Sequence, residues 1–495
     1  MKKNYILSID QGTTNTKAML VDINGSVKSI ASYPVPFIYP KPGWVEQNPS
    51  DIWDSVLKAI GDCLKQIENP EIAAIAITNQ RESILLWERK TGMPVGPCIT
   101  WGCSRTKEYL NKLSSQGLSS VIKNHTGLMI NTLFSSSKGR WLIKNAENGT
   151  KRAQSGELCL GTVDSWVLWN LTGKKVHACD MSNASRTQLF NINTLKWDEK
   201  MLEIFEIPNK VLPEVCKSND IFGKTVQIGR LKKNIPVACL IGDSHGSLFG
   251  HNIFEPGYVK NTHGTASSLI TPIKKAIISE LGVTTTIAWA INNQVLYAME
   301  GVLPTTGAVA QWICDIFKLD SLSALEKLAS TVPDCDGVYL VPAFSGLGAP
   351  YWDHNATGIF SGLTQRTQRA HLARAAEEAI AYQVCDLWEA LKQEIKTDFK
   401  ALLVDGGPSK DNFLMQFQAD IIGSPVLRNP SADLSAMGAA YMAGLSLGIW
   451  SSLEDIKKLA NPLDRFEPKL SSLKREELYK GWKNAVIRSR LKISI

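Results

Sequence analysis

The chain has 495 residues, of which 44% are hydrophobic and 20% charged, and its formal net charge is +7. These values are typical of a globular protein that is too long for one hydrophobic core, so we expect at least two domains. The positive charge is mild and contains no block of five like charges, which argues against nucleic acid or an anionic membrane as the partner.

Cysteine usage and hydropathy indicate a reducing compartment. The 10 cysteines are scattered from Cys63 to Cys385 without a CxxC pair, and we expect them to be buried thiols. The first apolar run is too short for a signal peptide, and no stretch approaches the ~20 apolar residues that cross a bilayer. We therefore predict a cytoplasmic protein without an integral membrane segment.

The first predicted element is a strand that runs into a polar turn. The apolar run Tyr5–Ile9 leads into Asp10-Gln11-Gly12-Thr13-Thr14. The glycine admits close backbone approach to an anion, the threonines add hydroxyl donors, and Asp10 is a candidate Mg²⁺ ligand. An ordinary hairpin turn is the alternative interpretation of this segment.

Further along the first half, strands alternate with helices, which is typical of α/β architecture. A second strand over 18–22 leads to a hairpin turn at Asn24-Gly25. Helical spacing over 51–67 follows, and then a buried strand over 72–77 that ends before Asn79-Gln80-Arg81-Glu82.

The second half repeats the order of strand, acid and small polar turn. A strand over 237–241 precedes Asp243, and another over 258–261 precedes Gly264-Thr265. A long helix is predicted over 372–391. The recurrence predicts two similarly built halves that face each other across a cleft, with the boundary at residue 250.

Two other patterns are interpreted as structural. Gly223-Lys224-Thr225 resembles the end of a P-loop, but position 218 is Ser218 and no strand run precedes it, so we expect a turn. His245, His251 and His263 lack the ligand spacing of a metal site, so we expect loop or core histidines.

The polar residues at the strand ends fit phosphoryl transfer, which needs a phosphate cradle, a metal anchor and a group that orients the attacking hydroxyl. Asp243 is the candidate base, with a loop-capping carboxylate as the alternative. Arg81 and Glu82 could bind vicinal hydroxyls, although a solvated charge pair would have the same sequence. Trp101 could form an apolar wall for a carbon chain, although a core tryptophan is the alternative. Gly406-Gly407 suits close approach to a flat ligand such as adenine, or a plain turn.

Several long segments resemble the FGGY family of carbohydrate kinases and, within it, the glycerol kinases. The segments lie at 39–46, 78–82, 183–187, 346–353 and 412–418, so the resemblance runs almost end to end. It implies an α/β fold of two actin-like ATPase (ribonuclease H-like) domains around a central cleft, residues 1–250 and 251–495. The implied reaction is transfer of the ATP γ-phosphate to a primary hydroxyl, glycerol giving glycerol 3-phosphate.

The resemblance also implies roles for individual residues. Asp243 would be the catalytic base, and Asp10 would serve Mg²⁺. Arg81, Glu82 and Trp101 would contact the polyol together with Asp243. The nucleotide would be lined by Thr13, Thr14, Lys17, Gly264, Thr265, Gly307, Gln311, Gly407 and Asn412. The expected ligands are therefore ATP, Mg²⁺ and a small polyol or sugar, and we expect a homodimer or homotetramer.

Four positions depart from the glycerol kinase pattern. Leu133 stands where tyrosine is usual, Ser244 where glutamine is usual and Ser268 where phenylalanine is usual, all three at the polyol site; Lys17 replaces an arginine. Two of the changes remove bulk and one removes a hydroxyl donor, so the pocket should be roomier. This favours a polyol with more carbons than glycerol. The loop at 229–233 also lacks the glycine-rich pattern of the family's fructose-bisphosphate site.

Three alternatives stay open. One is a kinase for a four- or five-carbon polyol or ketose, although pentulose kinases of the family lack the Arg81-Glu82 pair. Another is an actin-like ATPase used for conformational switching, for which residues 440–495 offer too little room for a peptide-binding domain. The third is a catalytically degenerate actin-like protein that binds ATP and transfers nothing.

Overall fold

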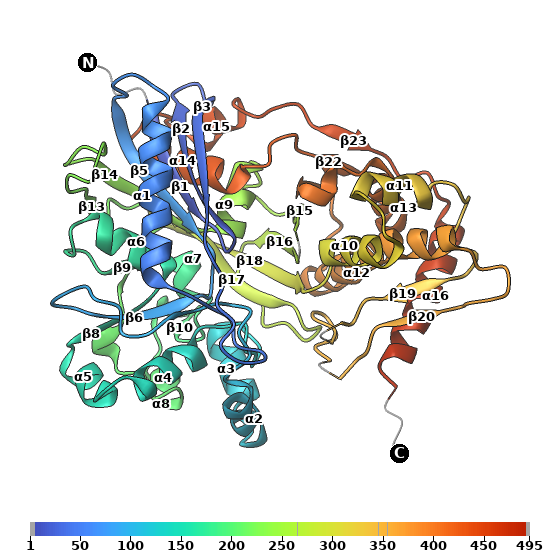
Figure 1. Cartoon of the computed structure of the whole chain (residues 1–495), viewed down its shortest axis with the longest axis horizontal. Helices are drawn as coiled ribbons and strands as arrows, with labels where there is room; N and C mark the ends of the chain where they lie inside the picture. The colour runs from blue at the N-terminus through green and yellow to red at the C-terminus, as the bar shows by residue number, and fades with distance from the viewer. Residues whose placement is uncertain (1–4, 265, 345, 354, 492–495) are drawn as a thin grey trace.

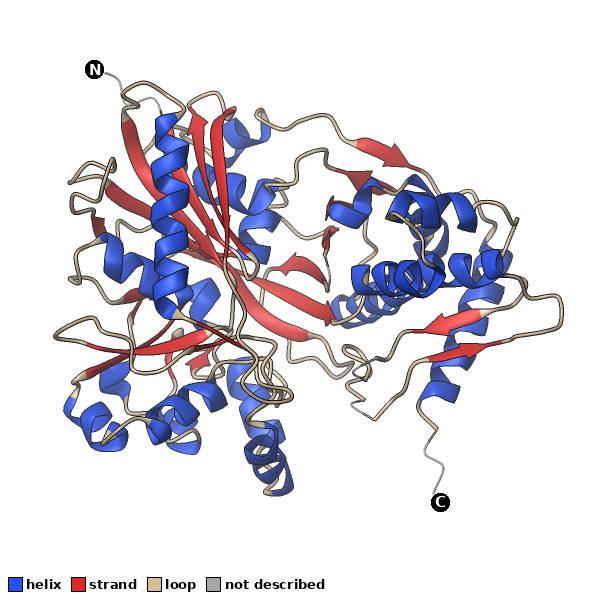
Figure 2. Ribbon diagram, in the orientation of Figure 1, coloured by secondary structure: helices blue, strands red, loops and turns tan. Residues whose placement is uncertain are grey.

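The computed structural model describes residues 5–264, 266–344, 346–353 and 355–491. Figures 1 and 2 show two α/β halves side by side, each with a sheet flanked by helices. The N-terminal half has a six-stranded sheet in the order β13-β14-β5-β1-β2-β3. The C-terminal half has a seven-stranded sheet in the order β17-β18-β16-β15-β21-β22-β23.

The two sheets share one topology. In the first, β1 (Tyr5–Gln11) pairs antiparallel with β2 (Asn15–Asp22), β2 pairs with β3 (Val27–Pro34), and β1 runs parallel to β5 (Ile72–Asn79) and β5 to β14 (Pro236–Gly242). In the second, β15 (Tyr258–His263), β16 (Ser267–Ile273), β18 (Gln294–Leu303), β21 (Ala401–Gly406) and β22 (Val426–Arg428) repeat these pairings. The predicted likeness of the halves is confirmed.

The predicted helices and strands match those observed, with small shifts at the ends. Helix α1 spans Pro49–Lys65 and α12 spans Arg369–Ile395. Asn48 caps α1 by accepting the Ser50 N–H, and the proline at the first helical position has no N–H that would need an acceptor. Gly223-Lys224, expected as a turn, forms the short edge strand β13 (Gly223–Lys224) that pairs with β14.

Insertions enlarge both halves. The N-terminal half adds a four-stranded sheet of β4 (Glu46–Gln47), β7 (Cys98–Ile99), β6 (Ile84–Glu88) and β8 (Leu158–Thr162). Its smaller helices are α2 (Lys107–Ser115), α3 (Ser119–Thr126), α4 (Ser136–Asn145), α5 (Gly149–Ser155), α6 (Val163–Leu171), α7 (Met181–Ala184) and α8 (Glu199–Ile204). The C-terminal half adds α10 (Gly307–Phe317), α11 (Leu322–Ala329), α13 (Asn412–Ile422), α15 (Leu453–Lys457), α16 (Ser472–Ser489) and the edge strands β17 (Thr284–Ile291) and β23 (Asp464–Phe466).

A shared core joins the halves. Helix α9 (Asp243–Gly250) crosses α14 (Leu434–Ser446) where glycines face each other, because a Cβ on Gly438 would lie 1.9 Å from the Gly246 carbonyl oxygen. The cluster around this crossing combines Ile6 and Ala74 of the first sheet with Leu403 of the second. The two halves are thus packed through a close helix pair rather than through a linker.

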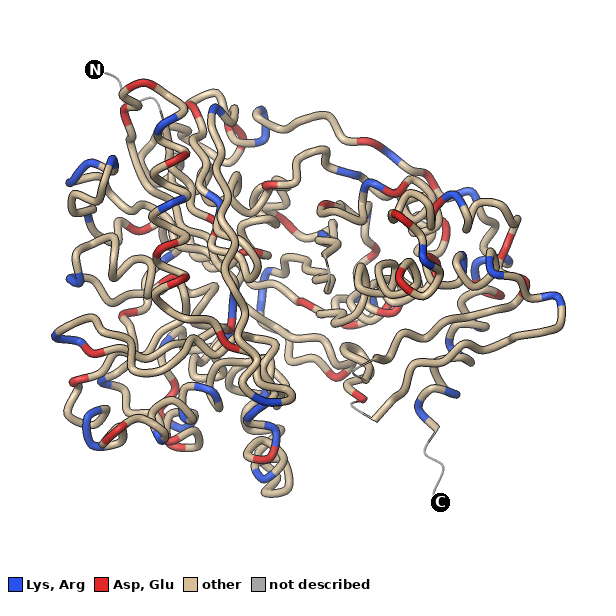
Figure 3. Tube along the Cα trace, in the orientation of Figure 1, with Lys and Arg blue, Asp and Glu red and all other residues tan. Residues whose placement is uncertain are grey.

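The distribution of charged residues and cysteines in the structure agrees with the expectations from the sequence. Lysine and arginine segments alternate with aspartate and glutamate segments over both halves (Figure 3). All ten cysteines are free, and nine are buried, with Cys216 partly exposed. Within the described ranges, no helix combines the length and apolarity that a membrane crossing requires.

Candidate active site

Two equivalent hairpin turns face the gap between the halves. In the turn between β1 and β2, the Gly12 N–H donates to the Asn15 carbonyl at 3.0 Å and Gln47 Nε2 donates to the Thr13 carbonyl at 2.7 Å. In the turn between β15 and β16, the Gly264 N–H donates to the Ala266 carbonyl at 3.1 Å. Thr265, expected in this turn, lies outside the described residues. Glycine-containing hairpin turns of this kind can bind phosphate through backbone N–H groups.

Glycines bring other segments close to the second hairpin. The Gly307 N–H at the start of α10 donates to the Gly264 carbonyl at 3.0 Å, and a Cβ on Gly307 would lie 2.4 Å from that oxygen. Gly407 follows β21 and has no atom within 4 Å of where its Cβ would be. Gln311 lies one turn along α10, and Asn412 begins α13 and accepts a hydrogen bond from Arg428. Gly264 and Gly307 are therefore in direct contact, whereas Gln311 and Asn412 are exposed on α10 and α13.

Three carboxylates and one lysine gather at the first hairpin. Asp10 is partly buried at the end of β1, and burial together with the negative charges of Asp243 and Asp433 raises its pKa to about 7, against the opposing effect of Lys17. Lys17 Nζ lies 2.6 Å from Asp433 Oδ1, which ties the first hairpin to the loop before α14. Asp433 was not anticipated from the sequence. This excess of negative charge is what a bound cation would neutralise.

Asp243 is a partly exposed acid at the start of a helix. It begins α9 directly after β14, and its side chain is 36% exposed. Its Oδ1 accepts from Arg81 Nε at 3.1 Å and from the Ser244 N–H at 2.6 Å. A Cβ on Gly242 would lie 2.7 Å from the Arg81 side chain, so the glycine before Asp243 makes room for Arg81. Among the described residues no hydrogen bond occupies Asp243 Oδ2.

A buried ion-pair network holds Arg81 in place. Arg81 Nη1 and Nη2 donate to both oxygens of Glu300 at 2.8 and 2.7 Å, and Arg186 Nη1 lies 2.9 Å from Glu300 Oε2. Burial alone would raise the pKa of Glu300, but Arg186 and Arg81 hold it well below the ordinary value. Paired charges and bidentate bonds of this kind fix a guanidinium in one orientation.

Glu82 completes the network in an unusual backbone conformation. Its φ is 60°, in the left-handed region, and its Oε1 accepts from Arg186 Nε at 2.5 Å. Ser135 Oγ donates to its carbonyl at 2.8 Å. Strained backbone of this type is concentrated at functional sites. Neither Glu300 nor a role for Arg186 was predicted, although an acid within the apolar run of β18 was a signal for the former.

A cavity of about 180 Å³ lies between the halves at this network. The N-terminal half lines it with Thr13, Arg81, Glu82, Trp101, Leu133, Asp243 and Ser244, and the C-terminal half with Thr262, Ala266, Ser267, Ser268 and Val302. All predicted polyol contacts therefore lie around one cavity. Trp101, Leu133 and Val302 also line an adjoining cavity of about 660 Å³, which extends toward Leu347 and Trp352.

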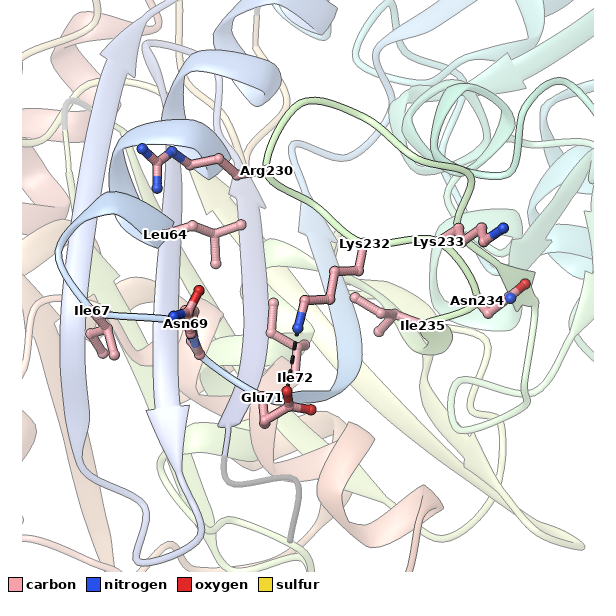
Figure 4. Close-up of a pocket in the computed structure, with 11 residues that line it drawn as sticks. Leu64, Ile67, Asn69, Glu71, Ile72, Arg230, Lys232, Lys233, Asn234 and Ile235 are labelled. Carbon is pink, nitrogen blue, oxygen red and sulfur yellow. Dashed lines mark hydrogen bonds and ion pairs between the residues drawn. The ribbon is translucent and has the colours of Figure 1, made fainter. Parts of the chain in front are cut away.

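Other polar features lie away from this cavity. Figure 4 shows a hollow of about 370 Å³ at the far end of β5, where Lys232 Nζ lies 3.3 Å from a Glu71 oxygen and Arg230 reaches over Leu64. His245, His251 and His263 are core residues, with at most 7% of each exposed. In the described part of the chain, no group of three or more His, Cys, Asp or Glu side chains is arranged to hold a metal.

Comparison with known proteins decides the family. The N-terminal domain of the FGGY family of carbohydrate kinases matches residues 5–250, and its C-terminal domain matches residues 259–447. The chain belongs to the FGGY family of carbohydrate kinases. It is therefore a kinase that acts on an alcohol, and the expected fold of two actin-like domains is confirmed.

Similar FGGY proteins cover the whole chain. "Glycerol kinase 2" of Thermotoga maritima is 46% identical over 489 residues, 98% of each chain, and the glycerol kinase of Caldanaerobacter subterraneus is 46% identical over 491 residues, again 98% of each. The crystal structure of Plasmodium falciparum glycerol kinase with ADP superposes with a TM-score of 0.94 at 34% identity, covering 99% of both chains. A xylulose kinase from Lactobacillus acidophilus, at 24% identity and a TM-score of 0.89, shares the fold and covers 98% of this chain and 97% of its own.

Proposed function

We propose that this FGGY kinase transfers the γ-phosphate of ATP to a primary hydroxyl of glycerol or a closely related polyol. The observation that supports it best is the cavity in which Arg81, Glu82 and Asp243 of one half face the β15–β16 hairpin of the other. Full-length relatives named glycerol kinase support the same substrate class. A switching ATPase would leave these polyol-binding side chains without a purpose.

We propose that the proton of the attacking hydroxyl goes to one atom, Oδ2 of Asp243. Arg81 and the Ser244 N–H occupy Asp243 Oδ1, so Oδ2 accepts the hydrogen of the attacking hydroxyl. The hydroxyl oxygen forms a bond to the γ-phosphorus while the bond from that phosphorus to the β,γ-bridging oxygen breaks. ADP leaves with the bridging oxygen, and Asp243 passes the proton to solvent. The hairpins and closure of the halves would orient the phosphates and exclude water.

We propose that Asp10 serves a divalent cation whose other ligands would be phosphate oxygens and water, since the described residues form no cage of three or more ligating side chains. Asp10, with its pKa raised by burial and by Asp243 and Asp433, is a hard oxygen donor in a site with excess negative charge. When bound, Mg²⁺ would neutralise phosphate charge. Of the nucleotide contacts, we propose Thr13, Thr14, Lys17, Gly264, Thr265 and Gly307 for the phosphates, and Gln311, Gly407 and Asn412 for the nucleoside.

A second candidate is a polyol or ketose of four or five carbons. Leu133, Ser244 and Ser268 line the cavity, and its wall at Trp101, Leu133 and Val302 is shared with the adjoining cavity of about 660 Å³. Ser268 Oγ donates to Glu300 at 2.5 Å, and Ser244 Oγ lies 3.5 Å from Ser268 Oγ. In this proposal the two serine hydroxyls and the adjoining space would take up an additional hydroxymethyl group.

The test is ADP formation by the purified chain with Mg-ATP and a panel of glycerol, dihydroxyacetone, tetritols, pentitols and ketoses. The highest kcat/KM for glycerol supports the first candidate, and the highest value for a longer polyol supports the second. ADP formation that no polyol stimulates contradicts both and favours an ATPase, whereas no ADP formation at all favours a degenerate ATP-binding protein.

We also propose domain boundaries and an oligomeric state. Residues 1–250 would form the polyol-binding domain with the first phosphate hairpin, and residues 251–495 the nucleotide-binding domain. A homodimer or homotetramer remains a prediction, which light scattering of the purified chain would test.

A further inference from the structure

A lysine is buried directly behind the wall of the polyol cavity. Lys138 lies in the first turn of α4, and its side chain is fully buried. Its Nζ donates to the Leu133 carbonyl at 2.9 Å and to the Trp101 carbonyl at 3.2 Å. Both of those residues line the cavity. One amino group therefore joins two wall segments that are more than thirty positions apart in the chain.

The surroundings of Lys138 do not explain its charge. It makes no ion pair with any described residue, and the nearby Glu82 carboxylate is bonded to Arg186. The other groups that influence the charge of Lys138 are Cys98 in β7, Cys103 a few residues after that strand, and Arg105. Burial lowers the pKa of Lys138 to about 7, with Cys103, Glu82 and Cys98 opposing the shift. A buried amine without a counter-charge is costly, so stability alone gives no reason for it.

Trp101 connects this lysine to the phosphate hairpin. The Trp101 indole Nε1 donates to Thr13 Oγ1 at 3.0 Å, and the Trp101 N–H donates to Ser83 Oγ at 3.2 Å. A shift of the Trp101 backbone would therefore move both the polyol wall and the hydroxyl of Thr13. The Lys138 bond to the Trp101 carbonyl is the third anchor of that residue.

We propose that Lys138 is a positioning residue for the acceptor substrate. By holding the Trp101 and Leu133 carbonyls together, it sets the width of the polyol cavity without touching the polyol. The proposal rests on the proposed function, since it assumes that this cavity binds the acceptor.

The first test is Lys138→Met, which keeps the length of the side chain and removes both hydrogen bonds. We expect KM for the best polyol of the panel to rise about tenfold, the equivalent of two modest hydrogen bonds, with KM for ATP unchanged and kcat little altered. Lys144→Met is the matched control. Lys144 lies on the same helix but is exposed and pairs with Glu206, so its replacement should change neither constant.

The second test is the pH dependence of KM for the polyol at saturating Mg-ATP. Since hydrogen bonds from a charged amine are stronger than those from a neutral one, loss of the proton near pH 7 should raise KM in the wild type. The Lys138→Met variant should show the raised KM at all pH values, without this step. If that variant does not fold, as judged by melting temperature and stabilisation by Mg-ADP, Lys138→Gln decides, since it keeps a hydrogen-bond donor but cannot titrate. A raised KM that no longer changes with pH supports the proposal, and a wild-type KM and pH profile overturn it.

The outcomes separate the two proposals. A folded Lys138→Met variant with wild-type KM for the polyol, or with a fall in kcat alone, overturns the positioning role and leaves the proposed function intact. A wild-type chain that phosphorylates no polyol overturns the proposed function and, with it, the role of Lys138.

Discussion

At the scale of residues, the proposal makes the accessible carboxylate of Asp243 the group that accepts the substrate proton. Asp243→Asn keeps the shape and the Arg81 contact but removes the base, so we expect kcat to fall by about 10²–10⁴-fold. Stabilisation by Mg-ADP, measured by thermal unfolding, should persist. Turnover close to the wild-type rate would show that another group takes the proton.

Glu300 forms ion pairs with Arg81 and Arg186 and is not among the residues that line the cavity. Glu300→Gln leaves Arg81 and Arg186 without their shared counter-charge, and breaking a buried ion pair on one side costs about 3–5 kcal/mol. We expect a lower free energy of unfolding in urea and a higher KM for the polyol, because Arg81 loses its orientation. Asp464→Asn is the control: Asp464 pairs with an arginine but is exposed, and its replacement should cost less than about 1 kcal/mol. Equal stability of both variants would contradict the role of Glu300.

At the scale of elements, a substitution in the turn after β21 can test nucleotide binding without affecting stability. A Cβ on Gly407 meets no atom within 4 Å, so Gly407→Ala should leave the melting temperature unchanged. If the nucleotide approaches this turn, the added methyl group should raise KM for ATP severalfold while KM for the polyol stays the same. An unchanged KM for ATP would place the nucleotide elsewhere.

At the scale of the whole molecule, the crossing of α9 and α14 is a close packing contact between the halves. A methyl group on Gly438 would overlap the Gly246 carbonyl, so Gly438→Ala should separate the helices and destabilise the protein by about 1–3 kcal/mol. Gly61→Ala, in α1 where a Cβ meets nothing within 4 Å, is the matched control and should be neutral or stabilising. Equal melting temperatures for the two variants would show that the crossing tolerates a side chain.

The sequence predicted individual residues best where a motif and a strand end coincide. Asp10, Gly12 and Asp243 each follow an apolar run, and the structure places Asp10 in the last two residues of β1, Gly12 directly after β1 and Asp243 directly after β14. The partners of those residues were not predictable. Glu300 and Asp433 lie hundreds of positions from Arg81 and Lys17, and no local pattern indicates which buried acid neutralises which base.

The sequence by itself determined the repeated α/β halves, the two polar hairpins and the candidate acids, because hydrophobic periodicity and turn chemistry are local properties of the chain. Only the tertiary structure decided that Glu300 joins Arg81 to Arg186, that Lys138 reaches the carbonyls of Trp101 and Leu133, and that the cavity at Arg81 and Asp243 adjoins a larger one. These contacts join residues that lie far apart in the chain, within the N-terminal half for Lys138 and across the two halves for Glu300. They are set by close packing and by the pairing of buried charges across long sequence separations.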